Sequence, residues 1–384
     1  MDRVIRAASL LRSKGVVARL KEAEEDINKY LKPCIENMLL DDFLMVLRRW
    51  NSYTPALRTT DENSLGGGYF ISWHGKGIII DPGFDFIRNF HNEGLSIGCI
   101  HAIIMTHSHL DHISDFEPLL TLLYEYNEQR RKDIEAGKLS SKPKYIHIYA
   151  SPGTLRKCSG WLDYSHTARK GETMISRIYA MDPFSVQMPI NIPQTDIFIK
   201  PTYAEHNELI ASGYSTGVLV DLYDGDKREV SIGFTGDSAW TEEVSVQYDD
   251  SDILVMHIGT VTQRELITLE PYKKHLGAIG CLNFLKNESD KRKMNIFSEF
   301  GEEFRETRRE IMATIKSVSK RPQACIVADV GTKISLPDVK LRCEFTNCKA
   351  EAMPDDYYEY YGIVKHYCSA HVQYKTKWAF FDDI

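Results

Sequence analysis

The sequence predicts an α/β protein in which candidate functional residues follow short buried strands. Short apolar runs with the length of buried strands recur along the chain, as at Gly77–Ile80, Ile103–Met105 and Ile197–Ile199. Longer stretches that suit helices lie between them, as at Phe116–Lys132 and Ala278–Leu285. Short apolar runs favour buried strands, whereas a 3.6-residue period over a longer window indicates a helix.

The predicted elements divide the chain into three segments. Residues 1–41 carry an approximate helical stripe of apolar side chains, which predicts a helical arm. Such an arm could cap the main domain or mediate a homodimer or another protein contact. Residues 42–336 contain the main domain, which begins with a strand at Phe43–Trp50 and a turn at Gly66–Gly68 into the next strand. Residues 337–384 form a small separate unit.

Composition and charge are ordinary for a soluble protein. The net charge is −7, so no overall field attracts nucleic acid. No apolar run reaches the length of a membrane span, and the charged N-terminus lacks the apolar core of a signal peptide. We therefore expect a cytoplasmic protein with no membrane partner. Five isolated cysteines are expected mostly as small buried thiols, namely Cys34, Cys99, Cys158, Cys281 and Cys325.

Four side chains that can bind metal lie within six positions, directly after the strand predicted at Ile103–Met105. They are His107, His109, Asp111 and His112, in the pattern H-x-H-x-D-H. Four such groups leaving one strand end cannot easily all bind one ion, so we expect two adjacent ions that share a water. Imidazole suits zinc, iron and similar metals, and the carboxylate adds affinity for harder ions.

Three further candidates each close a short apolar strand. His206 follows the run Ile197–Ile199, Asp237 follows Val230–Gly233, and Asp81 closes the strand that begins at Gly77. Strand ends that meet along one edge of a sheet sandwich would place these side chains near the H-x-H-x-D-H segment.

Taken in order, these residues resemble the metallo-β-lactamase superfamily, over roughly residues 42–336. The signature of that superfamily is a strand-end Asp, H-x-H-x-D-H, a lone His, a lone Asp and a final ligand. The resemblance implies a four-layer αβ/βα sandwich with two catalytic divalent ions. It implies metal binding by His107, His109, Asp111, His112, His206 and Asp237. Asp81 is expected to hold a ligating His by its other ring nitrogen and so fix its tautomer.

Three later segments resemble the ribonuclease Z-like branch. Asp252–Thr260 is similar to its H-E-A-T segment, Tyr272–Gly277 to its H-S-T segment, and Met294–Phe304 to its T-H-F-S-x-R-Y segment. In that branch the H-S-T histidine donates a proton and the T-H-F-S histidine is the last metal ligand. The resemblance therefore implies that His275 is the general acid and that Glu299 replaces the last ligand.

Two departures from the branch bear on these roles. Glu299 would make the second metal site rich in carboxylates, so manganese or iron would compete with zinc there. In the alternative assignment His275 is the ligand and Glu299 is an ordinary acid at a helix start. The second departure is Ile258, which stands where the H-E-A-T segment has its Glu.

The resemblance implies a metal-dependent hydrolase in which a metal-bridged hydroxide attacks a phosphodiester of RNA, DNA or a cyclic nucleotide. The same chemistry would serve a carboxylic ester, lactone or thioester hydrolase, and a third possibility is a catalytically idle scaffold. The spacings from His206 to Asp237 and from Asp237 to His275 leave no room for a long tRNA-binding arm or a large cap domain.

The C-terminal segment offers four soft ligands in two close pairs, Cys343 with Cys348 and Cys368 with His371. Two close pairs brought together by a loop are typical of a tetrahedral structural zinc site. The alternatives are a lone disulfide or scattered buried thiols, and His366 could compete with His371. This zinc module could also contact a protein partner.

Overall fold

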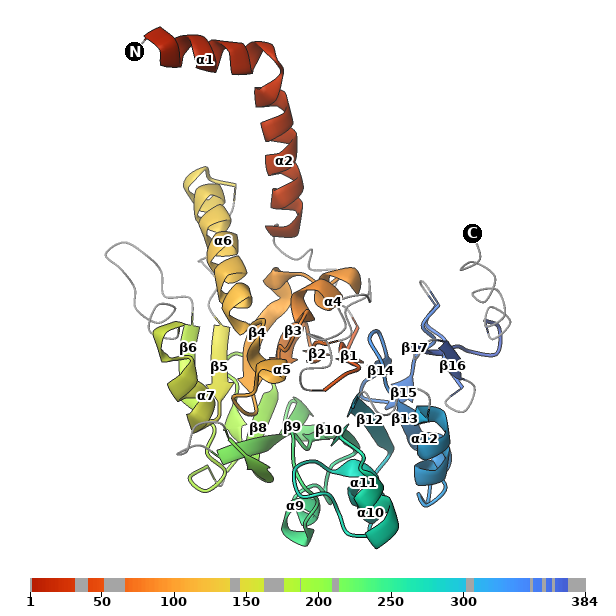
Figure 1. The fold of residues 1–384 in the computed structure, drawn as a ribbon. Helices are drawn as coiled ribbons and strands as arrows, with labels where there is room; N and C mark the ends of the chain where they lie inside the picture. Colours follow the sequence, from red (N-terminus) through yellow and green to blue (C-terminus); the bar gives the residue numbers. More distant parts are fainter. Residues whose placement is uncertain are drawn as a thin grey trace.

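The computed structural model describes residues 2–31, 41–51, 66–138, 146–161, 176–186, 188–208, 214–301, 307–345, 348–353, 357–360 and 363–371. Two large β-sheets pack face to face, and helices cover their outer sides (Figure 1). This arrangement confirms the αβ/βα sandwich that the sequence predicts.

The first sheet has eight strands in the order β15-β14-β1-β2-β3-β4-β5-β6. Their bounds are β1 Phe43–Val46, β2 Tyr69–Trp73, β3 Lys76–Ile80, β4 Ile100–Met105, β5 Ile146–Ala150, β6 Ser176–Ala180, β14 Lys333–Ser335 and β15 Lys340–Leu341. Strands β2 and β3 form a hairpin whose two turn residues, His74 and Gly75, both have positive φ. Glycine is favoured in such turns because it adopts positive φ without steric cost. Strand β1 is shorter than the predicted Phe43–Trp50.

The second sheet has seven strands in the order β13-β12-β11-β10-β9-β8-β7. Their bounds are β7 Ile190–Asn191, β8 Ile197–Asn207, β9 Tyr214–Asp224, β10 Lys227–Phe234, β11 Ile253–Gly259, β12 Met294–Phe300 and β13 Cys325–Val327. Strands β7 to β10 pair antiparallel, and β10 to β13 pair parallel. Parallel strands in register end at the same edge of the sheet, so residues far apart in sequence meet there.

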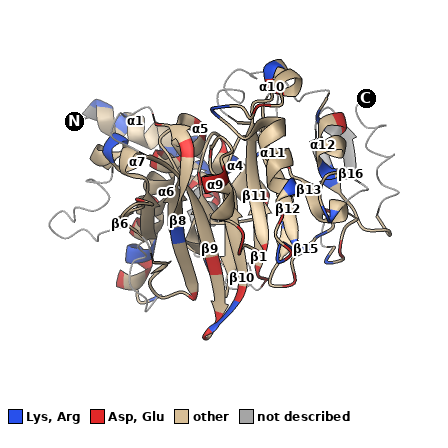
Figure 2. Ribbon diagram, turned by 90° about the horizontal axis from the view of Figure 1, so that it is seen from below, with Lys and Arg blue, Asp and Glu red and all other residues tan. Residues whose placement is uncertain are grey.

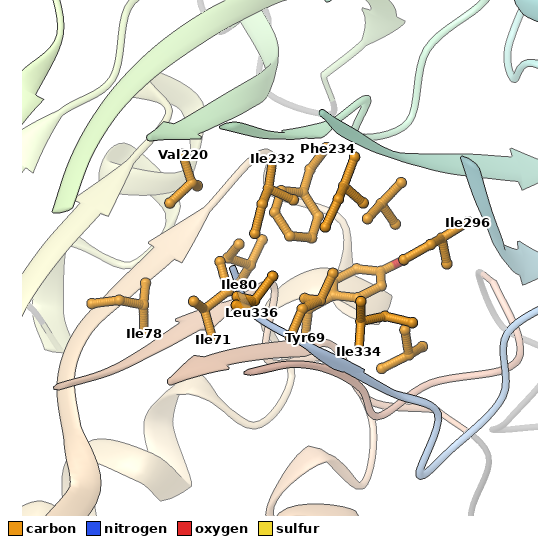
Figure 3. Close-up of a cluster of buried hydrophobic side chains, with 14 of the residues drawn as sticks. Tyr69, Ile71, Ile78, Ile80, Val220, Ile232, Phe234, Ile296, Ile334 and Leu336 are labelled. Atoms are coloured by element: carbon orange, nitrogen blue, oxygen red, sulfur yellow. The ribbon is translucent and has the colours of Figure 1, made fainter. Parts of the chain in front are cut away.

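The core lies between the two sheets (Figure 3). Ile78 and Ile80 from β3 face Val220, Ile232 and Phe234 from the second sheet, and all five are fully buried. On β10 every second residue points into this core, which is the period expected of a strand with one face on another sheet. Burying each such side chain stabilises the fold by about 1.5–3 kcal/mol, so the sandwich does not depend on its polar edge.

Helices complete the outer layers. The first sheet is covered by α4 Phe86–Asn92, α5 Leu110–Ile113, α6 Phe116–Glu135 and α7 Pro152–Lys157, with a 3₁₀ turn, η2, at Ile97–Cys99. The second sheet carries α9 Glu242–Val246, α10 Gln263–Thr268, α11 Gly277–Lys286 and α12 Arg308–Lys316, with a 3₁₀ turn, η4, at Pro322–Ala324. Helices α6 and α11 confirm the two main-domain helices predicted from the sequence.

The N-terminal arm is helical, as predicted, and consists of α1 Asp2–Ser13 and α2 Val16–Leu31. It extends away from the sandwich, and α2 contacts α6 (Figure 1). Its apolar stripe is exposed at Leu10, Leu11, Val17 and Leu20. None of the helices described is both long and apolar enough to span a membrane. A homodimer or protein contact through the arm stays a prediction.

The C-terminal segment joins the sandwich at its edge. Strand β15 lies beyond the predicted boundary at residue 336 and belongs to the first sheet, while Cys343 and Cys368 are buried with the core between the sheets. A small hairpin follows, formed by β16 Tyr357–Tyr360 and β17 Ile363–His366. The boundary itself stays a prediction.

Of the five isolated cysteines, Cys34 lies outside the described residues, and among the other four one differs from the expectation. Cys99 is buried and disulfide-bonded rather than a free thiol. Apolar neighbours in the sequence predict that a cysteine is buried. They do not show whether its sulfur is a free thiol or part of a disulfide, because both are buried in the same way. Cys158, Cys281 and Cys325 are buried free thiols, as expected.

Candidate metal centre

The predicted ligands converge at one edge of the sandwich. Strands β4, β8, β10 and β12 carry them at or near their C-terminal ends, and helix α5 continues from β4. They are His107, His109, Asp111, His112, His206, Asp237 and Glu299.

The first group consists of His107, His109, His206 and Asp237, whose candidate ligand atoms all lie within 4.8 Å of one another. His206 Nε2 lies 3.2 Å from His109 Nδ1, and His107 Nε2 lies 3.7 Å from Asp237 Oδ2. Burial, with the neighbouring imidazoles, lowers the pKa of His107 well below its usual value and that of His109 to about 4. Both rings are therefore neutral, which is the state that binds metal.

The second group consists of Asp111, His112 and the same Asp237. His112 Nε2 lies 3.3 Å from Asp111 Oδ2, 3.6 Å from Asp237 Oδ1 and 3.8 Å from Glu299 Oε2. Burial alone would lower the pKa of His112, but these carboxylates raise it well above its usual value. The negative charge of these carboxylates therefore favours a positively charged group or ion at this position. Because Asp237 belongs to both groups, the two candidate sites are neighbours that share one carboxylate.

Asp81 lies behind the second group and is fully buried. It accepts hydrogen bonds from the backbone N–H and the hydroxyl of Thr106, each at 2.7 Å, and its Oδ2 lies 2.9 Å from His112 Nδ1. This contact directs the other ring nitrogen, Nε2, at the candidate ligands. The role of Asp81 in fixing the tautomer of His112 stays a prediction.

Glu299 is surrounded by three residues that the sequence analysis did not single out. Its Oε1 lies 3.0 Å from Arg48 Nη1 and 2.8 Å from His257 Nδ1, and accepts a hydrogen bond of 3.2 Å from the Tyr69 hydroxyl. Its Oε2 has no hydrogen-bond partner and faces His112. Glu299 lies within β12 rather than after it and has a φ of 58°, a strained value for a residue other than glycine.

Arg48 links both acids of the second site. Its Nη2 lies 3.5 Å from Asp111 Oδ2, while Nη1 contacts Glu299. The guanidinium is fully buried, and ion pairs with two carboxylates compensate for part of its desolvation. It fixes the positions of Asp111 and Glu299 relative to each other.

The structure also shows which of the missed residues left a signal in the sequence. His257 follows the apolar run Ile253–Met256, so the rule that located His206 and Asp237 would have found it. Arg48 and Tyr69 left no such signal, because a lone arginine after a strand and a tyrosine within one are both common.

His275 lies just before α11, at the rim of the site. Its Nδ1 is 3.5 Å from Asp237 Oδ2, and its side chain is 15% exposed. Gly259 makes room for the ring, because a Cβ at Gly259 would lie only 2.5 Å from an atom of the imidazole. His275 is outside the metal-capable groups among the described residues, whereas Glu299 belongs to one together with Asp237 and His257.

The loop between His107 and His109 is held on both sides. Glu208, directly after β8, accepts hydrogen bonds from the backbone N–H and the hydroxyl of Ser108, and from the Ser151 hydroxyl at 3.0 Å. Lys157 Nζ donates to the Ser108 carbonyl at 2.5 Å. These contacts restrict the loop that carries two of the candidate ligands.

The residues present fit divalent metal ions. Four buried atoms that face one another have no hydrogen-bond partner, namely His107 Nε2, His112 Nε2, Asp237 Oδ1 and Glu299 Oε2. Leaving a buried polar atom unpaired costs about 1–3 kcal/mol. Metal coordination would satisfy all four atoms and neutralise the surplus carboxylate charge.

A separate group in the C-terminal segment consists of Cys343, Cys348, Cys368 and His371. The Cys348 and Cys368 sulfurs lie 3.9 Å apart, and His371 Nδ1 lies 3.2 Å from the Cys368 sulfur. All three cysteines are free, which excludes the alternative of a disulfide among them. Sulfurs about 3.8 Å apart suit a tetrahedral zinc with bonds of about 2.3 Å. His366 is engaged with Glu344 instead.

We predict about three metal ions per chain, two at the shared-carboxylate centre and one at the Cys3His group. Elemental analysis of protein purified without chelator measures this number. A content of one ion or none per chain would exclude the assignment.

Replacing Cys343 or Cys368 with Ser should loosen the C-terminal segment, because it removes one ligand of the ion that would hold Cys343, Cys348, Cys368 and His371 together. Limited proteolysis should then cut after roughly residue 336 while the main domain resists. Cys158→Ser, which alters a buried thiol elsewhere, is the control and should leave the segment protected. Equal protease resistance in all variants would contradict a structural zinc.

Comparisons with known proteins identify a family and a shared fold. A family model described as a beta-lactamase superfamily domain matches residues 76–296. The metallo-beta-lactamase fold protein YhfI from Bacillus subtilis superimposes with a TM-score of 0.53 at 14% identity, covering 76% of this chain and 98% of its own. The short form of human tRNase Z superimposes with a TM-score of 0.51 at 16% identity, covering 77% and 99%.

At these identities the solved structures show a shared fold and nothing finer. A search of curated protein sequences finds no match. The family model covers more than half of the chain, including the H-x-H-x-D-H segment, His206, Asp237 and His275. The chain therefore belongs to the beta-lactamase superfamily, in its metal-binding form with the αβ/βα sandwich.

Proposed function

We propose that the protein is a hydrolase that uses two divalent ions to cleave phosphodiesters. The observation that carries the proposal is Asp237, which belongs to two adjacent groups of buried ligands. His107, His109 and His206 would complete one site, and Asp111, His112 and Glu299 the other. The Cys3His group would hold a third, structural zinc. The two catalytic ions, when bound, would make water acidic and neutralise charge on the attacked group.

The side chains that contact the candidate ligands support this use. Asp81 orients His112, Arg48 holds Asp111 and Glu299, and Glu208 and Lys157 hold the loop at Ser108. Such contacts are what a precisely positioned centre requires.

His275 supplies an argument for a substrate with an alkoxide leaving group, such as a phosphodiester. An alkoxide needs a proton donor, whereas the thiolate of a thioester leaves with little help. The His275 ring lies at the partly exposed rim, with its centroid 5.2 Å from that of His206, where a leaving alcohol could depart. We assign His275 as the group that donates this proton.

A carboxylic ester, lactone or thioester hydrolase is the alternative, and Ile258 favours it. Ile258 is fully buried and apolar at the position where the ribonuclease Z-like branch has an acid to support its proton donor. Asp237, through its contact with His275, would have to serve instead.

The proposal is tested by comparing bis(p-nitrophenyl) phosphate with p-nitrophenyl butyrate on protein loaded with zinc or manganese. We expect turnover of the phosphodiester with a clear preference over the ester. The Asp111→Ala protein, purified in parallel, controls for contaminating activity. Preference for the ester would favour the alternative, and no turnover of either would favour a scaffold role. RNA, DNA and cyclic nucleotides, which the resemblance to the ribonuclease Z-like branch implies as substrates, would be assayed next.

A further inference from the structure

A cavity of about 800 Å³ opens directly beside the candidate metal centre. His206 forms part of its wall, and the same ring contacts His109 within the first group of ligands. The volume is in the range of pockets that enclose small molecules. A substrate bound in this cavity would have one end at the metal centre, so the lining residues decide which substrates are accepted.

Three aromatic rings line the cavity. They are Phe184, Tyr203 and Tyr214. The centroid of Phe184 lies 5.7 Å from that of Tyr203 and 4.8 Å from that of Tyr214, and the Phe184–Tyr214 pair is T-shaped. Phe184 is 57% exposed and Tyr214 is 50% exposed, so both side chains are accessible to a ligand.

The charged residues that line the cavity are all acidic among the described residues. Glu205, Glu208 and Glu243 contribute carboxylates, and the described residues that line the cavity include no lysine or arginine. Glu208 is occupied with Ser108 and Ser151, and Glu205 accepts the hydrogen bond of the Tyr203 hydroxyl. Glu243 lies exposed in the first turn of α9, where Figure 2 shows acidic residues. A cleft lined by one sign of charge concentrates ligands of the opposite sign and repels polyanions.

We infer that the cavity binds a cationic group on the substrate, of the quaternary ammonium class. Aromatic faces attract such cations through the quadrupole of the ring, and neighbouring carboxylates add Coulomb attraction. Carboxylates in the same cavity disfavour the flanking phosphates of a nucleic acid. The inference rests on the proposed function and narrows it: the substrate is a small phosphodiester whose alcohol carries a positive charge.

Three p-nitrophenyl phosphodiesters with the same leaving group test the inference. Their second alcohols are choline, its neutral isostere 3,3-dimethylbutanol, and the 5′ hydroxyl of thymidine. Because the leaving group is constant, differences in kcat/KM report recognition of the second alcohol. We expect the choline ester to exceed the neutral ester by about 10-fold, as cation–π attraction of ordinary strength would give.

Variants locate the preference in this cavity. Phe184→Ala and Glu243→Gln should each reduce the ratio of choline to neutral ester towards one. Glu242→Gln is the matched control, because Glu242 is the neighbouring acid of α9 and is not among the lining residues. It should leave the ratio unchanged. Equal kcat/KM for the choline and neutral esters, or preference for the thymidine ester, would overturn the inference.

A binding measurement separates failure of the inference from failure of the proposed function. If no phosphodiester is cleaved, the proposed function fails, and calorimetric titration with tetramethylammonium chloride then tests the cavity alone. Binding that exceeds a sodium chloride titration at equal ionic strength and is lost in Glu243→Gln supports the cation site. Identical heats for the two salts, or binding that Glu243→Gln leaves intact, overturn it.

Discussion

Asp111→Ala or His109→Ala should abolish turnover while the fold stays native. Each residue belongs to a different ligand group, so each variant impairs one of the two candidate ion sites. A bound divalent metal lowers the pKa of water from far above neutral to about 7. Loss of that activation should cost many orders of magnitude in rate. Steady-state assay with bis(p-nitrophenyl) phosphate measures the loss.

Circular dichroism and thermal unfolding of the same variants separate chemistry from folding. The circular dichroism spectra should remain close to wild type, because neither substitution alters the apolar core between the sheets. His109→Ala should also keep the unfolding temperature, whereas Asp111→Ala removes a carboxylate from the buried Arg48 and should lower it. Asp290→Ala is a suitable control, since its carboxylate is on the surface and pairs with Lys320. Wild-type turnover by Asp111→Ala or His109→Ala would rule out the proposed centre.

Substitutions of His275 and of Glu299 should reduce activity for different reasons. If His275 donates the proton, His275→Ala should keep both catalytic ions and lose about 10²–10⁴ in rate on substrates with poor leaving groups. The loss should shrink on nitrophenyl substrates, whose leaving group needs no proton. Comparing an alkyl phosphodiester with a nitrophenyl phosphodiester measures this dependence.

Glu299 variants should instead lose metal from the second site, and their turnover of all substrates should fall by the same factor. Glu299→Ala also leaves Arg48 without its shortest ion pair, and breaking a buried pair costs about 3–5 kcal/mol. Glu299→Gln keeps the size of the side chain and an oxygen for Tyr69, so it is the safer variant. Metal analysis of both proteins decides the assignment. If His275→Ala loses an ion and Glu299→Gln does not, the two roles are reversed.

Much of the metal centre could be predicted because most of its candidate ligands lie at or near the ends of strands. A short apolar run followed by His or Asp is visible in the sequence, and parallel strands bring such ends to one edge. That reasoning placed His206 and Asp237 near His107, although 130 positions separate His107 from Asp237. The same reasoning applied to β11 would have included His257.

The remaining features depend on three-dimensional packing. Arg48 becomes informative only when it is seen buried between Asp111 and Glu299, since a single arginine has no period or motif. The aromatic cavity joins Phe184, Tyr203 and Tyr214 from separate segments, and nothing local marks them as neighbours. The disulfide state of Cys99 likewise depends on which sulfur approaches it.

The position of strand β15 at the edge of the first sheet means that the Cys3His group affects the whole sheet. This strand is the last of the first sheet, and the segment that follows Cys348 lies along it. The Ala352 N–H donates to the Leu341 carbonyl, and the Cys343 N–H donates to the Ala350 carbonyl. An uncovered edge strand presents unpaired backbone groups that recruit other chains into a growing sheet. By tying Cys343 to Cys348, Cys368 and His371, the zinc would keep this edge covered. Chelation would then cause aggregation through the first sheet before the core between the sheets unfolds.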